Sequence, residues 1–286
     1  MQIFRDPKLL QSYIAAQRFQ GKKIGLVPTM GALHRGHAAL VRESLKTTDI
    51  TICSIYVNPI QFNDQQDLKN YPRQLDQDLE FLRALNCHAV FCPSNEVMYP
   101  SKPILSMALG RLENIMEGRY RPGHFKGVAL VVSKLFNFVQ PEVAYFGEKD
   151  WQQLVIIRQL VEDLSFPLEI VGVPIVRESD GLALSSRNQR LTETDRSVAP
   201  QLYQSLLLVR TMLEKQSSIE TAGNAGEEYL AQFPSISLEY LEIVTAHELD
   251  RPTSELGSEP LSICAAAFLG EVRLIDNLRV FDLPQA

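Results

Sequence analysis

Residues 23–37 decide the fold: they read Lys23-Ile24-Gly25-Leu26-Val27-Pro28-Thr29-Met30-Gly31-Ala32-Leu33-His34-Arg35-Gly36-His37. The apolar run Ile24–Val27 predicts a strand buried inside a parallel sheet. Proline cannot donate to a strand ladder, so we expect this strand to end at Pro28. Gly31 and Gly36 then predict a tight turn whose backbone another group can approach closely.

The two histidines of this stretch, His34 and His37, stand where a helix begins that we expect to run to about Lys46. A helix N-terminus offers unpaired N–H groups and partial positive charge, and imidazoles add further donors. The turn therefore favours phosphate. The alternatives are a metal ion or two unrelated loop histidines. Zinc would need further ligands, yet the chain has only three other histidines and no Cys-x-x-Cys pair.

The composition is that of an ordinary globular protein. The 286 residues, 45% hydrophobic and 22% charged, suffice for one large or two modest domains. A net charge of −6 without a long basic run argues against general nucleic-acid binding. We expect the cytoplasm, because no signal segment and no membrane-spanning stretch is visible. The four cysteines show no disulfide framework, and Cys53 and Cys264 lie in apolar runs that predict reduced core residues.

Strands and helices alternate over the first two thirds of the chain. A helix is expected between Asp6-Pro7 and Gly21. Further strands are expected at 50–57, 89–92, 143–146 and 168–176, and further helices at 75–85, 128–138 and 151–161. This alternation predicts an α/β fold, a Rossmann-like parallel sheet with flanking helices.

A turn-rich break at Arg177–Gly181 marks the predicted domain boundary. Residues 1–177 would form the Rossmann-like domain. Residues 178–286 would form a smaller C-terminal α+β domain that closes over the site. In it we expect helices at 193–215 and 219–232, and strands at 238–245 and 261–269.

Polar side chains follow two of the expected strands. Asn58 and Gln61 come directly after the second strand, and ligands of parallel α/β sheets bind off the carboxyl ends of strands. We therefore expect them to face the same crevice as the histidines. The alternative is an Asn-Pro turn with an exposed glutamine. Residues 147–150 form a second strand-to-helix turn in which Asp150 can cap the helix, with Gln153 in its first turn.

Two loop regions could also meet an anion. Residues 93–127 predict long loops of the kind that form lids, and they contain the densest positive cluster, Arg119, Arg121, His124 and Lys126. This cluster is either a solvated loop or a contact for an anionic ligand. The second region, Leu184–Asn188, offers hydroxyls and a guanidinium, which are natural phosphate donors.

Five stretches in chain order resemble the pantoate–β-alanine ligase family of the His-x-Gly-His nucleotidyltransferase superfamily. They are Pro28-Thr-Met-Gly-x-Leu-His-x-Gly-His37, Asn58-Pro-x-Gln-Phe62, Arg121-Pro-Gly-His-Phe125, Phe146-Gly-Glu-Lys-Asp-x-Gln-Gln153 and Leu184-Ser-Ser-Arg-Asn188. The resemblance implies that ATP activates the pantoate carboxylate as an adenylate, which β-alanine then attacks. Pantothenate, AMP and pyrophosphate would be the products. It also implies Mg²⁺. Asp76 and Asp78 are candidate ligands of this ion, and the alternative is that both are helix-surface carboxylates. The resemblance further implies a homodimer without membrane or nucleic-acid partners.

The resemblance also implies that residues 1–177 bind ATP and pantoate, and it implies roles for individual residues. His34 and His37 would serve the triphosphate, with Lys149, Ser185, Ser186 and Arg187 as a clamp; these six are the predicted catalytic residues. Gly147 and Asp150 would lie at the ribose, and Val176 at the adenine. Gln61, Gln153 and Asn58 would bind pantoate, with β-alanine attacking near Gln61. The rest of the implied ATP site consists of Met30, Gly31, Ala32, Leu33, Arg35, Gly36, Glu148 and Leu184.

Three other functions remain as alternatives at this point. A related nucleotidyltransferase could adenylylate a phosphate monoester, but it would have no reason to carry the Asn58–Phe62 and Gln152-Gln153 stretches. A non-catalytic sensor would bind ATP without turnover. A zinc hydrolase built on His34 and His37 would contain metal and be inhibited by chelators of zinc.

Overall fold

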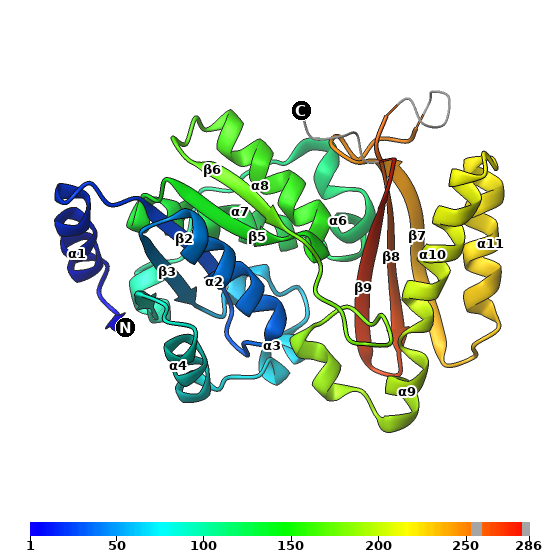
Figure 1. The fold of residues 1–286 in the computed structure, drawn as a ribbon, viewed down its shortest axis with the longest axis horizontal. Helices are drawn as coiled ribbons and strands as arrows, with labels where there is room; N and C mark the ends of the chain where they lie inside the picture. Colours follow the sequence, from blue (N-terminus) through cyan, green and yellow to red (C-terminus); the bar gives the residue numbers. More distant parts are fainter. Residues whose placement is uncertain (253–258, 282–286) are drawn as a thin grey trace. The chain divides into compact units, whose positions relative to one another are not determined.

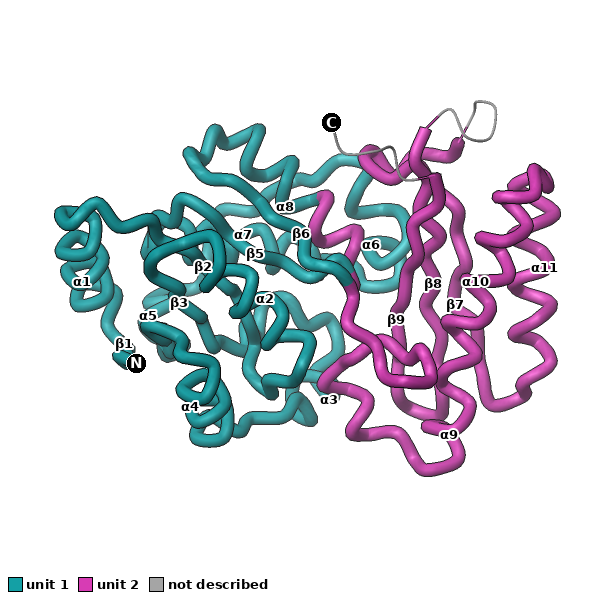
Figure 2. The backbone as a smooth tube through the Cα atoms, in the orientation of Figure 1, with its two compact units in different colours: residues 1–148, 156–174 teal, residues 149–155, 175–286 magenta. Residues whose placement is uncertain are grey.

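The computed structural model describes residues 1–252 and 259–281 (Figure 1). The backbone divides into two compact units, residues 1–148 with 156–174 and residues 149–155 with 175–286 (Figure 2). The predicted fold class is confirmed, since one unit holds a parallel sheet with helices and the other a small sheet with helices. The domain limits of 1–177 and 178–286, with their assigned roles, stay predictions.

The first unit is organised around a six-stranded parallel sheet (Figure 1). Its order is β1-β4-β3-β2-β5-β6. The strands are β1 (Gln2–Phe4), β2 (Ile24–Thr29), β3 (Ile50–Ile55), β4 (Ala89–Phe91), β5 (Val143–Gly147) and β6 (Glu169–Val173). The strand order reverses between β2 and β5, and such a switch point opens a ligand crevice at the carboxyl ends of the strands. The turn that follows β2 therefore lies at the place where this architecture binds ligands.

Helices cover both faces of this sheet. The helices along this part of the chain are α1 (Pro7–Phe19), α2 (Arg35–Thr47), α3 (Gln65–Asn70), α4 (Leu75–Ala84), α5 (Asn95–Met98), α6 (Met116–Tyr120), α7 (His124–Val139) and α8 (Trp151–Asp163), whose first turn belongs to the second unit. Alternate residues of β5 show how the faces differ. The Tyr145 hydroxyl meets Thr47 of α2, whereas the Phe146 ring packs edge-on against Phe136 of α7. Side chains of α2 and α4 complete the core on the Tyr145 face.

The prediction that the first strand ends at Pro28 is wrong, because β2 continues to Thr29. Successive residues of a strand direct their backbone groups to opposite neighbours. The Thr29 carbonyl accepts a hydrogen bond from the β3 side, so the nitrogen of Pro28 faces the β5 side. The β2–β5 ladder reaches only to Leu26, and no partner strand requires the missing N–H.

Several predicted limits also differ from the observed ones. Strands β3 and β6 stop earlier, at Ile55 and Val173, and α7 begins already at His124. Residues 93–127 contain α5, α6 and the 3₁₀ turn η2 (Gly110–Glu113) rather than loops alone. The three-residue β1, which the sequence did not predict, is too short to show a period.

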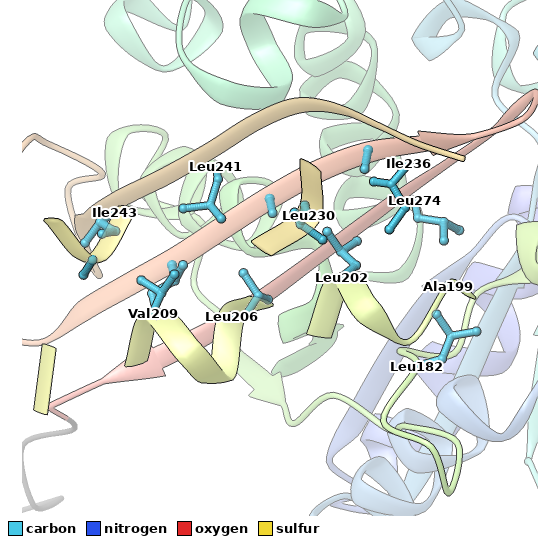
Figure 3. Close-up of a cluster of buried hydrophobic side chains, with 14 of the residues drawn as sticks. Leu182, Ala199, Leu202, Leu206, Val209, Leu230, Ile236, Leu241, Ile243 and Leu274 are labelled. Atoms are coloured by element: carbon cyan, nitrogen blue, oxygen red, sulfur yellow. The ribbon is translucent and has the colours of Figure 1, made fainter. Parts of the chain in front are cut away.

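The second unit packs two helices on a three-stranded antiparallel sheet. The sheet has the order β7-β8-β9 and consists of β7 (Ile236–Thr245), β8 (Leu261–Leu269) and β9 (Val272–Val280). Helices α10 (Gln201–Glu214) and α11 (Ile219–Ala231) lie along it. Leucines of α10 and apolar residues of all three strands form one buried cluster, part of which Figure 3 shows.

Two sequence expectations for this unit are corrected. The helix predicted at 193–215 is divided into α9 (Glu193–Val198) and α10, because Pro200 lacks the N–H that would continue the first helix. Strand β9 was missed, because Asp276 and Asn277 interrupt its apolar alternation although both are buried. Among the described helices, none is long and apolar enough to cross a membrane.

All four cysteines are buried and none forms a disulfide, so the prediction that Cys53 and Cys264 are reduced core residues is confirmed. Burial raises the pKa of Cys87 to about 11 and that of Cys92 to about 11, and it also raises the pKa of Cys53. Unfolded thiols release their protons from about pH 8.5, while the folded ones retain them. The free energy of unfolding should therefore be highest below this pH and fall as the pH rises towards 11. Urea titrations at pH 8 and pH 10 would measure this decrease in the free energy of unfolding. The decrease should be smaller in Cys87→Ala, and an equal decrease in the variant would contradict the contribution of Cys87.

Candidate active site

The turn after β2 is held by a carboxylate from α4. The Ala32 and Leu33 amides donate to Asp78 Oδ2 and Oδ1 at 2.9 and 2.8 Å, and all three residues are buried. Gly31 and Ala32 both have positive φ, 83° and 50°. A left-handed alanine costs about 1–2 kcal/mol, and the two hydrogen bonds to a charged acceptor offset this cost.

A side chain on Gly31 would also disturb this anchor, because its Cβ would lie 2.9 Å from Asp78 Oδ2. Asp78 itself is buried, so the alternative that it is a helix-surface carboxylate is wrong. Asp76 is exposed, as that alternative requires. The sequence contained a signal for this anchor. Asp78 stands three residues after Leu75 and four before Leu82, on the apolar face of α4.

The two histidines cap α2 with their own rings. His34 Nδ1 accepts from the Gly36 amide at 3.1 Å, and His37 Nδ1 accepts from the His34 amide at 3.2 Å. The rings lie 4.1 Å apart between centroids. Since Nδ1 is an acceptor in both, each neutral ring carries its proton on Nε2. The His34 and Gly36 amides are thus bonded to the two rings, which leaves the Nε2 groups as the ring donors at this helix N-terminus, and phosphate binding there stays a prediction.

Asn58 and Gln61 belong to one buried network rather than to an exposed turn. Asn58 Nδ2 donates to Gln61 Oε1 and to the Gly127 carbonyl, both at 3.1 Å. Its Oδ1 accepts from the Tyr99 hydroxyl at 3.0 Å. Gln61 Nε2 donates to Met30 Sδ at 3.0 Å, so the glutamine reaches the turn after β2. The alternative of an exposed glutamine is wrong, because Gln61 is 7% exposed.

Helix α7 fixes the backbone of Gln61. A Cβ on Gly127 would lie 2.6 Å from Gln61 Cα, so only glycine allows this approach. His124 Nδ1 lies 2.8 Å from the Gln61 carbonyl and donates to it, because that oxygen can only accept. Tyr99, His124 and Gly127 are supporting residues that the sequence did not identify in this role. They come from the region that the sequence described as loops.

The positive cluster of that region is divided in the structure. His124 is buried and its Nε2 lies 3.1 Å from Arg121, which in turn lies 3.7 Å from the Glu117 carboxylate. Lys126 pairs with Glu113 at 3.0 Å. Arg119 is exposed. The four side chains therefore differ in burial and pairing, and their contact with an anionic ligand stays a prediction.

A cavity of about 380 Å³ adjoins the turn within the first unit. It lies at the carboxyl ends of β3 and β4, and its polar lining includes Tyr56, Arg73, Asp78 and Asn95. Met30 and Gly31 also line it. The cavity therefore lies beside the turn, and the two histidines, Asn58 and Gln61 are not among the residues that line it.

In the second unit, the predicted residues lie at the start of α8 and in one hairpin. Lys149 and Asp150 belong to the turn η3 (Glu148–Asp150), immediately before α8. Trp151 Nε1 donates to the Ala246 carbonyl at 3.1 Å and thereby fixes the helix start. Gln153 is half-buried in the first turn of α8. Whether Asp150 caps this helix stays a prediction.

The hairpin at residues 176–187 carries the predicted hydroxyls and guanidinium. The Leu184 amide donates to the Val176 carbonyl at 3.0 Å, and the backbones of Arg177 and Ala183 form an antiparallel β-bridge. Ser185 then begins the 3₁₀ turn η4 (Ser186–Arg190), and its Oγ accepts from the Arg187 amide at 3.3 Å. Ser186 is buried, whereas Ser185 and Arg187 are half-buried, and their contact with anionic oxygens stays a prediction.

The described residues fit a magnesium ion carried by phosphates better than one held in a protein cage. They contain no group of three or more His, Cys, Asp or Glu side chains arranged to hold a metal. Asp78, one of the two candidate ligands, already accepts two backbone amides. Magnesium in ATP sites takes one or two carboxylates together with phosphate oxygens and water.

Comparisons with known proteins agree along almost the whole chain. The sequence model of the pantoate-beta-alanine ligase family matches residues 2–279. A pantothenate synthetase of Bacteroides thetaiotaomicron is 48% identical over 279 residues, which cover 98% of this chain and 99% of that protein.

Solved structures give the same result. A pantoate-β-alanine ligase (pantothenate synthetase) from Thermus thermophilus superposes with a TM-score of 0.92 at 42% identity, covering 99% of this chain and 100% of that one. A pantoate-β-alanine ligase from Francisella tularensis, in complex with β-γ ATP and β-alanine, gives a TM-score of 0.81 at 36% identity over 97% of each chain. The family that the five sequence stretches indicated is therefore confirmed: the chain belongs to the pantoate–β-alanine ligases.

Proposed function

We propose that the chain condenses (R)-pantoate with β-alanine to pantothenate, converting ATP to AMP and pyrophosphate through a pantoyl-adenylate. The observation that carries this proposal is the family match over residues 2–279, which spans both units. The solved relative with β-γ ATP and β-alanine supports the same substrates. The reaction belongs to pantothenate biosynthesis.

The first step forms the adenylate. A pantoate carboxylate oxygen attacks the α-phosphorus of ATP, and the bond to the β-phosphate oxygen breaks as pyrophosphate leaves. Negative charge gathers on phosphate oxygens, so donors that are already fixed in place lower the barrier. We assign this task to the Nε2–H groups of His34 and His37, with Lys149, Ser185, Ser186 and Arg187 as further donors. The rigid capping of α2 by both rings supports the assignment, because it holds the two donors in one orientation.

The second step forms the amide. The neutral β-alanine nitrogen attacks the acyl carbon, the bond to the adenylate oxygen breaks, and AMP leaves while the nitrogen loses a proton. We assign pantoate binding to Gln61 and Gln153, and we place the amine near Gln61. The contacts of Gln61 with Asn58, Met30 and α7 support this role, because they orient its amide in advance.

Three further elements of the proposal rest on the family. Bound Mg²⁺ would neutralise phosphate charge, with Asp76 and Asp78 as its candidate carboxylates. The chain would form a homodimer and act in the cytoplasm. Light scattering of the purified protein would measure the dimer directly, and a monomer mass would contradict it.

Product analysis tests the proposed function. ATP and Mg²⁺ are supplied, and pantoate and β-alanine are omitted in turn. AMP should appear together with pantothenate only when both are present. An adenylyl group retained in the product would indicate an adenylyltransferase. ATP binding without any AMP would indicate a sensor, and either result would overturn the ligase.

Replacing Gln153 should affect one substrate more than the other. We expect Gln153→Ala to raise the KM for pantoate more than the KM for ATP, because the lost amide would bind pantoate oxygens. Steady-state kinetics with each substrate varied would measure both constants. Gln159→Ala is a matched control, since Gln159 lies exposed on the same helix and bonds only locally to Asp163 in the described contacts. Equal increases in both KM values for Gln153→Ala would refute the pantoate assignment.

A further inference from the structure

The outer edge of β9 is occupied by an arginine from the hairpin. In the order β7-β8-β9, β9 pairs on one side only. Arg177 donates to both oxygens of Asp276, at 2.6 and 2.9 Å, and to the Asn277 carbonyl at 3.1 Å. The Asp276 side chain is only 3% exposed, so this two-pronged pair is almost fully desolvated. A fork of this kind fixes the guanidinium in position and in plane.

Arg177 also closes its own hairpin. The same guanidinium donates to the Gly181 carbonyl at 3.0 Å and lies over the Tyr203 ring, 3.8 Å from its centroid. The hairpin leads directly into Ser185, and η4 contacts β9. The position of the predicted phosphate donors is thus tied to β9 through Arg177.

The neighbouring residue of β9 reaches the other predicted donor. Asn277 Nδ2 donates to the Lys149 carbonyl at 2.9 Å, although 128 residues separate the two. Asn277 is 4% exposed. Burial raises the pKa of Asp276 above its usual value, and the hydrogen bonds and charge of Arg177, the Asn277 amide and the charge of Lys149 offset only part of this increase.

From these contacts we infer that Asp276 and Asn277 are positioning residues for the candidate nucleotide clamp. Asn277 holds the backbone of Lys149, and Asp276 holds the hairpin that carries Ser185, Ser186 and Arg187. The inference rests on the proposed function, since it takes these four residues to bind ATP phosphates. Neither residue of β9 touches the nucleotide in this scheme, and each acts through the donor that it holds.

The chain offers a matched control on the same strand. Arg273 of β9 pairs with Glu239 of β7, and each of these side chains is 17% exposed. This ion pair joins β9 to β7 and includes neither Lys149 nor a residue of the hairpin. Arg273→Ala should therefore lower stability without a specific effect on ATP.

The decisive experiment is a double-mutant cycle between Asn277 and Lys149. Asn277→Ala should lower kcat/KM for ATP about 10-fold or more, since small displacements of a reacting group have effects of this size. In a Lys149→Ala background the same substitution should change kcat/KM by less than about twofold, because the donor that it positions is gone. If Asn277→Ala does not fold, Asn277→Leu keeps the side-chain volume and still removes the donor.

The outcomes separate the inference from the proposed function. If Lys149→Ala alone leaves ATP-dependent turnover intact, the proposed clamp is wrong, and the inference falls with it. If Lys149→Ala impairs turnover but Asn277→Ala lowers kcat/KM equally in both backgrounds, Asn277 is merely structural. The ion pair between Arg177 and Asp276 is tested by a conservative variant. Asp276→Glu should retain more ATP-dependent activity than Asp276→Ala, and equal losses would overturn the role of this ion pair.

Discussion

His37→Ala should lower turnover about 100-fold or more, the scale for losing one donor to a transition-state oxyanion. The imidazole that it removes carries its proton on Nε2, because Nδ1 accepts the His34 amide. The substitution also removes half of the capping box of α2. A lost cap costs about 1 kcal/mol, which leaves the protein folded. Turnover and the urea midpoint are measured on the same preparation.

The asparagine variant separates the two roles of this residue. In His37→Asn the Oδ1 atom occupies about the place of Nδ1 and can accept the His34 amide, but no Nε2–H remains. We expect it to restore the stability of the helix start while turnover stays low. Recovery of turnover in His37→Asn, or loss of folding in His37→Ala, would make His37 a structural residue.

Asp78→Ala should destabilise the protein by about 3 kcal/mol, because it leaves two buried amides without an acceptor. These amides belong to Ala32 and Leu33, inside the turn that precedes the histidines. Turnover should fall about 100-fold, since the turn loses the anchor that holds its left-handed residues. Chemical denaturation and steady-state kinetics measure the two effects.

Asp76→Ala is the matched control on the same helix, because Asp76 is exposed and its loss should change stability by less than about 0.5 kcal/mol. Magnesium provides the second arm of the test. If Asp78 acts as an anchor, raising the Mg²⁺ concentration should not restore the activity of Asp78→Asn. Restoration would show that its main role is to bind the metal.

The sequence predicted the fold class because its evidence is local. Apolar runs of strand length alternate with helical periods from Ile24 to Val173, and this pattern requires no knowledge of distant contacts. It failed where a local rule was overridden. Pro28 remains in β2 because the neighbouring ladder has already ended, and β9 forms around two polar residues whose partners lie elsewhere.

The candidate site shows the same division. The turn, the two histidines and the pair Asn58 and Gln61 were recognised from spacing and resemblance, since residue types at fixed intervals are visible in a sequence. The alternative of an exposed glutamine is excluded only by the packing of α7 against Gln61. Likewise, the role of Asp78 depends on amides 46 and 45 residues away.

The sequence by itself thus determined the α/β architecture, the reduced thiols, the family and the turn at which its chemistry is expected. Only the tertiary structure decided which atoms hold that turn, that Nδ1 of both imidazoles accepts a backbone amide, and that residues of β9 bond to the Lys149 carbonyl and to the hairpin. The physical reason is range. Periodicity and turn chemistry act over a few residues, whereas hydrogen bonds that orient a site join segments whose proximity exists only after the chain has folded.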